Sequence, residues 1–114
     1  MKEISPVISL AGLREALEQG GEVEVECIDT PFRQTNSYRG AWKFYVLAEI
    51  DGVRHRLLFV HGRDIRPRII RTATGLISFA IELGVSPVAI PRFAGERAVW
   101  TRHDGRMPED VSGD

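Results

Sequence analysis

The sequence predicts a single α+β domain, with a mixed or antiparallel sheet of four to five strands and two helices that cover one face. Three observations support this class. A chain of 114 residues suits one hydrophobic core. Apolar residues alternate at strand period in some segments and recur at helical period in others. One Asp-Gly dipeptide joins two alternating segments. The expected order is α-β-β-β-α-β-β over residues 1–103, followed by a disordered acidic tail, residues 104–114.

The first helix is expected in SLAGLREALEQGG, residues 9–21. Ser9 suits the N-cap, leucines recur at helical spacing, and the two glycines suit the C-terminal end. In the next segment, EVEVECI, residues 22–28, polar and apolar residues alternate strictly. This pattern predicts a strand with one solvent-exposed face of glutamates. Cys27 falls on the apolar face, so we interpret it as a buried apolar residue and not as a nucleophile.

The segment TPFRQTNSYRG, residues 30–40, predicts a polar loop longer than the usual four to six residues. Aromatic side chains alternate with arginines in and beside it. This mixture is typical of proteins that bind single-stranded nucleic acid and equally of protein interfaces, and the sequence leaves both open. The candidate residues of this interface or stacking loop are Phe32, Arg33, Tyr38, Arg39 and Trp42.

A hairpin is expected in AWKFYVLAEI and VRHRLLFVH, because the Asp-Gly dipeptide at 51–52 suits a two-residue type I′ turn. The turn sets the register of the two strands. It places Glu49 opposite Arg54, as a pair of opposite charge, and His61 opposite Trp42. One face of this hairpin is almost entirely apolar and is expected to lie on the core.

A second helix is expected over residues 66–83, in RPRIIRTATGLISFAIEL. Asp64 would cap it, Pro67 is tolerated in a first turn, and apolar residues recur at helical spacing until Gly84. Two short strands are expected next, in SPVAIPRF and RAVWTRH. The prolines make the first of them an edge strand.

Positive charge is concentrated in the middle of the chain. The formal net charge is only -1, yet residues 54–103 hold nine arginines against three acids. Thirteen of the 15 basic residues are arginine, which suits bidentate contacts with phosphate or carboxylate. Codon bias in a GC-rich genome would explain the arginines equally well. Small size and arginine bias together lead us to expect a bacterial protein.

The arginines around the expected hairpin and helix form the candidate anion-binding or nucleic-acid-binding site. Some lie on the outer face of the hairpin, and others lie at the expected helix start, where unpaired N–H groups attract anions. Internal pairing with the glutamates at 22, 24, 26 and 49 is the open alternative. The candidates are Arg54, Arg56, Arg63, Arg66, Arg68 and Arg71.

The sequence offers no catalytic residues, metal site or cofactor site. His55 and His61 would lie roughly 20 Å apart on one strand at about 3.3 Å per residue, too far to share a metal. The element order resembles that of the PD-(D/E)xK nucleases. Their chemistry needs a carboxylate and a lysine where this chain has Arg54-His55-Arg56, so we expect no nuclease of that kind.

We therefore expect a small, non-catalytic, cytoplasmic accessory or regulatory protein. Its arginine-rich hairpin–helix surface would bind an anionic partner, either nucleic acid, which fits best, or an acidic protein surface. Two alternatives stay open: a protein–protein interaction module, such as a homodimeric adaptor or an inhibitor-like protein, and an enzyme that acts on a small anionic substrate. No apolar run is long enough for a membrane span, no signal peptide is recognisable, and one cysteine excludes an internal disulfide.

Overall fold

The computed structural model describes residues 7–62 and 65–102 and shows one α+β domain with two helices and a mixed sheet. The predicted four to five strands are too few, because seven are present in the described residues. Arg63, Asp64 and the predicted acidic tail lie outside the described residues. The elements are β1 (Val7–Ile8), α1 (Leu10–Glu18), β2 (Glu22–Gln34), β3 (Ser37–Ile50), β4 (Val53–His61), β5 (Arg66–Pro67), β6 (Ile70–Thr72), α2 (Ala73–Leu83) and β7 (Arg97–Thr101).

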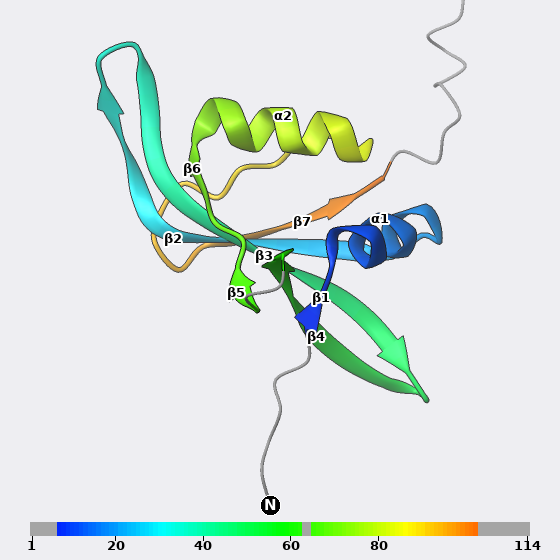
Figure 1. The fold of residues 1–114 in the computed structure, drawn as a ribbon. Coiled ribbons are helices and arrows are strands. Elements are labelled where there is room, and N and C mark those ends of the chain that lie inside the picture. Colours follow the sequence, from blue (N-terminus) through cyan, green and yellow to red (C-terminus); the bar gives the residue numbers. More distant parts are fainter. Residues whose placement is uncertain (1–6, 63–64, 103–114) are drawn as a thin grey trace, which may run out of the picture.

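The strands lie side by side in the order β1-β4-β3-β2-β7 (Figure 1). The β1–β4 pair is parallel, and the other pairs are antiparallel. The two additional strands are short: β5 pairs with β4, and β6 pairs with β3 beyond the point where β4 leaves it. Elements of two or three residues are too short to show an alternating pattern, which explains the undercount.

Both helices pack on the same face of the sheet, as predicted, and bury one core. The ring of Phe44 lies at its centre, with centroid distances of 5.1 Å to Phe79 and 5.8 Å to Trp100. Trp42 and Trp100 are fully buried, and their indole N–H groups donate to the carbonyls of Pro91 and Ala89 at 3.0 and 2.7 Å. These two bonds fix the segment after α2 to the core. No helix in the described part of the chain is long and apolar enough to cross a membrane.

The helix cap and the hairpin turn that neighbouring residues determine are present as the sequence predicts. The hydroxyl of Ser9 accepts from the N–H of Gly12 at 3.2 Å, as an N-cap should. Glu49 lies opposite Arg54 in the β3–β4 hairpin, and residues 51–52 have the positive φ angles that a type I′ turn requires. The placement of His61 opposite Trp42 is wrong. The described β3–β4 pairing ends at Tyr45, and Trp42 lies opposite Ile70 of β6 instead.

The predicted loop at 30–40 is instead part of a hairpin. β2 and β3 continue through it to a turn at residues 35–36, and Figure 1 shows this part, which we call the arm, rising beside α2. The pairing register shifts twice, between Cys27 and Asp29 and between Asp29 and Phe32. Such bulges bend a strand and interrupt its alternation, so the sequence pattern did not reveal the arm as a strand pair.

The second helix begins seven residues later than predicted. Thr72 is its N-cap, with a side chain that accepts from the N–H of Gly75 at 3.0 Å, and Gly84 ends it as predicted. Residues 66–72, which we call the strap, are mostly extended and contain β5 and β6. The N–H of Arg68 donates to the carbonyl of Phe59 at 3.0 Å, so the neighbouring strand supplies a partner that a helix would otherwise provide.

The predicted strand at 86–93 is absent, and these residues form a loop whose carbonyls at Ala89 and Pro91 accept from the indole N–H groups of the two tryptophans. Its prolines remove backbone donors that a strand ladder would need. The strand predicted after it is confirmed as β7, and Trp100 is fully buried there.

Candidate functional site

Arg54 and Arg56 are paired with glutamates on the side of the sheet away from the helices. Nη2 of Arg54 lies 3.4 Å from Oε1 of Glu22, and Nε of Arg56 lies 3.0 Å from Oε1 of Glu24. Arg56 also lies 3.8 Å from the ring centroid of Tyr45. Burial would lower the pKa of Arg56, but the hydrogen bond and charge of Glu24 outweigh it and raise the pKa. Internal pairing, the alternative left open by the sequence, therefore describes these two arginines.

The arginines of the strap have a different environment. Arg66, Arg68 and Arg71 are all exposed, and within the described residues no carboxylate lies within salt-bridge distance of them. Arg68 donates from Nη1 to the neighbouring carbonyl of Ile69 at 3.2 Å. In the part of the chain that the structure describes, no carboxylate competes with an external anion for these three guanidinium groups.

Arg68 and Arg71 line a shallow depression of about 410 Å³ between β6 and the outer face of α2. Ser78 and Phe79 form part of its wall, and Glu82 contributes one acid. Arg71 directly precedes the N-cap of α2, so it lies near the positive end of the helix dipole. The expected placement of arginines on the first turns of this helix is wrong, because the helix begins at Ala73, and only Arg71 lies next to its N-cap.

The pairing of β6 with β3 joins the strap to the arm. Arg39 of the arm lies opposite Thr72, the residue after Arg71. Within the arm, Arg39 lies opposite Phe32, and Tyr38 lies opposite Arg33. Because successive side chains of a strand point to opposite faces, Arg39 and Phe32 share one face of the arm and Tyr38 and Arg33 share the other.

The exposed fractions distinguish the aromatic residues predicted for this site. Phe32 and Tyr38 are 57% and 50% exposed, whereas Trp42 is fully buried. Because β6 pairs with β3, the strap arginines and the arm, which the sequence placed in two separate candidate sites, are neighbours in space. Trp42, the third predicted aromatic residue, belongs to the core.

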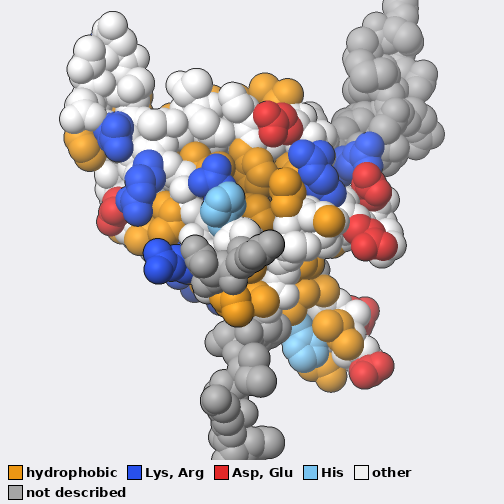
Figure 2. Space-filling view, viewed as in Figure 1, with side chains coloured by type: hydrophobic (Ala, Val, Ile, Leu, Met, Phe, Trp, Pro, Cys, Tyr) orange, Lys and Arg blue, Asp and Glu red, His pale blue; other side chains and the backbone are white. Residues whose placement is uncertain are grey.

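The charge distribution on the surface agrees with this arrangement. In Figure 2, Lys and Arg side chains lie over the region where Figure 1 shows the arm and the strap, with hydrophobic side chains between them. Most acidic side chains in this view lie in the other half of the molecule. Basic side chains in the other half of this view lie beside acids, so the excess of basic over acidic side chains is seen in the half that carries the arm and the strap.

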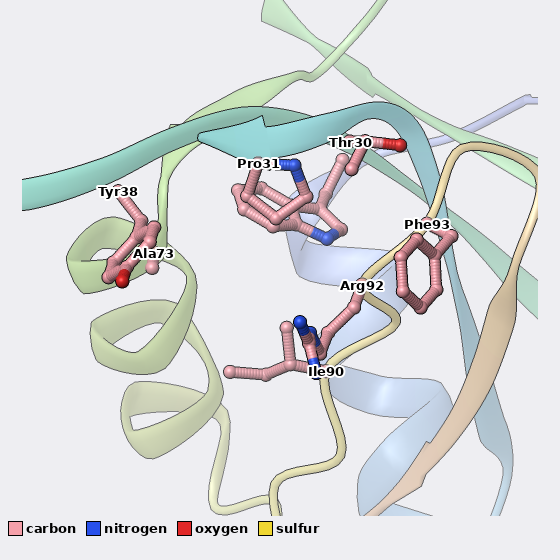
Figure 3. Close-up of a pocket in the computed structure, with 8 residues that line it drawn as sticks. Thr30, Pro31, Tyr38, Ala73, Ile90, Arg92 and Phe93 are labelled. Carbon is pink, nitrogen blue, oxygen red and sulfur yellow. The ribbon is translucent and has the colours of Figure 1, made fainter. Parts of the chain in front are cut away.

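A second hollow, of about 340 Å³, lies between the arm, the first residue of α2 and the loop before β7 (Figure 3). We call it the aromatic pocket. Sequence reasoning missed it because the loop residues were assigned to a strand and the arm to a loop. The residues that line it are Thr30, Pro31, Tyr38, Trp42, Ala73, Ile90, Arg92 and Phe93.

Hydrogen bonds hold the loop that forms one wall of this pocket. Oε1 of Glu96 accepts from the N–H groups of Arg92 and Phe93 at 2.6 and 3.2 Å. The N–H of Ala94 donates to the hydroxyl of Thr30 at 2.8 Å, and two backbone bonds join the loop to Cys27. Phe93 is nevertheless 57% exposed, so an aromatic ring is presented to solvent from a fixed backbone.

The groups that could support other chemistry are dispersed. Cys27 is fully buried, and burial, followed by the charges of Asp29 and Glu96, raises the pKa of its thiol. His55 is half-buried and His61 is exposed. No three His, Cys, Asp or Glu side chains lie together as metal ligands in residues 7–62 and 65–102. Comparisons of the chain with protein-family models, curated proteins and solved structures found no match.

Proposed function

We propose that the protein is a non-catalytic accessory or regulatory protein that binds nucleic acid through the surface formed by the strap and the arm. The observation that carries this proposal is the β3–β6 pairing, which brings two groups of exposed arginines together with exposed aromatic rings. We call this the basic surface. It wraps around the arm, because side chains on both of the arm's faces are exposed. Its residues are Arg33, Arg39, Arg66, Arg68 and Arg71, with Phe32 and Tyr38.

The chemistry of these side chains favours a polyanion. Guanidinium groups bind phosphate oxygens in bidentate fashion, and each neutralised phosphate releases counterions, which drives binding at low salt. The arginines are spread over a strap and an arm, an extended arrangement that matches a chain of phosphates better than one small anion. Aromatic rings among them add stacking surface for bases.

Arg54 and Arg56 belong to a different surface. Their charges are balanced by Glu22 and Glu24 on the face of the sheet away from the helices. A phosphate there would compete with carboxylates that are already in place. Of the arginines in the candidate anion-binding site, the proposed interface includes those of the strap and excludes Arg54 and Arg56. It also includes the arm.

Fluorescence anisotropy of labelled single-stranded and duplex DNA, in a salt series, tests this function. The variant Arg66→Ala/Arg68→Ala/Arg71→Ala removes three charges from the basic surface. The matched control, Arg54→Ala/Arg56→Ala/Arg97→Ala, removes three charges from the opposite face of the sheet.

We expect wild-type affinity to fall steeply with salt. The strap variant should bind at least ~10-fold more weakly and lose up to about 0.9 from the log–log salt slope for each phosphate contact removed. The control should bind like the wild type. Absence of binding at low salt, or equal losses in both variants, contradicts the proposal. Circular dichroism spectra of both variants establish that they are folded.

A further inference from the structure

We infer that the aromatic pocket binds one unstacked base of a single strand, so that the protein prefers single-stranded to duplex nucleic acid. This inference rests on the proposed function and adds the class of nucleic acid. It names a binding site that the arginine pattern does not identify.

The walls of the pocket suit a planar aromatic ring. Figure 3 shows Tyr38 and Phe93 on opposite sides of the hollow, with Ile90 and Arg92 between them. Pro31 and the buried ring of Trp42 complete an apolar lining. A base that enters can stack on exposed aromatic rings, and such stacking tolerates any base. The volume of about 340 Å³ lies at the lower end of the range for small-molecule sites.

The charge at the pocket suits the phosphate attached to such a base. Arg92 is the one charged residue among those that line the pocket, and its guanidinium carbon lies 5.3 Å from the ring centroid of Phe93. Ala73 is the first residue of α2, so the positive end of the helix dipole faces this site. A cationic rim with no acid in the lining favours an anionic ligand over a neutral one.

The pocket also continues into the basic surface. Tyr38 lies opposite Arg33, on the same face of the arm, and Arg71 lies two residues before Ala73 at the start of α2. A strand whose base occupies the pocket can therefore reach one arginine of the arm and one of the strap. This continuity makes a nucleic-acid chain a better occupant than an isolated aromatic molecule.

The pocket is held open in the free protein. The carboxylate of Glu96 and the hydroxyl of Thr30 fix the backbone of the loop, and the indole of Trp42 donates to the carbonyl of Pro91 at 3.0 Å. A preformed site avoids the entropic cost of ordering a loop on binding. A base in a duplex must first be unpaired and unstacked to reach this site, whereas a base in a single strand is already accessible.

The test uses a fluorescein-labelled 12-nucleotide deoxythymidine strand and a labelled duplex of equal length. The pocket variants are Phe93→Ala and Tyr38→Ala, which remove rings but no charge. The matched control is Val99→Ala, because Val99 is a similarly exposed apolar residue on β7, outside the pocket and the basic surface.

We expect each pocket variant to weaken single-strand binding by about 5- to 150-fold for one lost stacking partner. In Phe93→Ala, whose ring lies outside the basic surface, duplex binding and the salt dependence should stay unchanged, and Val99→Ala should bind like the wild type. Single-strand binding that is unaffected in both pocket variants, while the strap variant still loses affinity, overturns the pocket and leaves the proposed function standing. Failure of the wild type to bind either DNA overturns both.

Discussion

The carboxylate of Glu96 connects the stability of the domain to the shape of the aromatic pocket. Replacing it with alanine removes the acceptor for the N–H groups of Arg92 and Phe93. A hydrogen bond to a charged group contributes about 1.5–3 kcal/mol, and we take about 0.5–1 kcal/mol for each because Glu96 is exposed and screened. We therefore expect Glu96→Ala to lower the free energy of unfolding by about 1–2 kcal/mol, as loss of a helix N-cap does.

Urea denaturation followed by circular dichroism measures this change. Glu96→Gln keeps a neutral acceptor and should lose less than Glu96→Ala. Glu15→Ala is the matched control, since the side chain of Glu15 is exposed on α1 and has no hydrogen bond to the described residues. A Glu96→Ala protein as stable as the Glu15→Ala protein would refute the capping role. If the cap also positions Phe93, single-strand affinity should fall in Glu96→Ala and recover partly in Glu96→Gln.

Three further predictions concern other parts of the fold. Burial raises the pKa of the Cys27 thiol above its ordinary value of 9.0, so the unfolded chain loses this proton at lower pH than the folded protein. Stability should therefore fall as pH rises past about 9, and Cys27→Ala should flatten this decline in urea titrations at several pH values. Gly52→Ala should cost about 1 kcal/mol in thermal unfolding because φ is +80° there, although its Cβ would meet no atom within 4 Å; an unchanged melting temperature would contradict this. Arg56→Ala should cost about 1 kcal/mol or less in the same assay, since its ion pair with Glu24 is partly exposed, and a larger loss would show that the pair is better shielded than its exposure indicates.

The sequence predicted best where neighbouring residues decide the structure. Ser9 caps the first helix through an atom three residues away, and the positive φ angles at 51–52 set the hairpin register by themselves. The alternation in residues 22–28 likewise predicted which side of β2 is buried. The pairing of Arg54 and Arg56 with glutamates was recognisable as an alternative because β4 and β2 flank the same strand, β3, and present these side chains on one face of the sheet.

The tertiary structure decided the rest. The strap contains apolar residues at helical spacing, yet it is extended because distant strands supply its pairing partners: β4 pairs with β5, and the arm of β3 pairs with β6. The arm itself depends on bulges that break the strand pattern. Local preferences can favour a helix or a strand, but they carry no information about which distant N–H and C=O groups will become partners. Those long-range hydrogen bonds bring the strap arginines, the arm and Phe93 of the loop before β7 to one side of the domain.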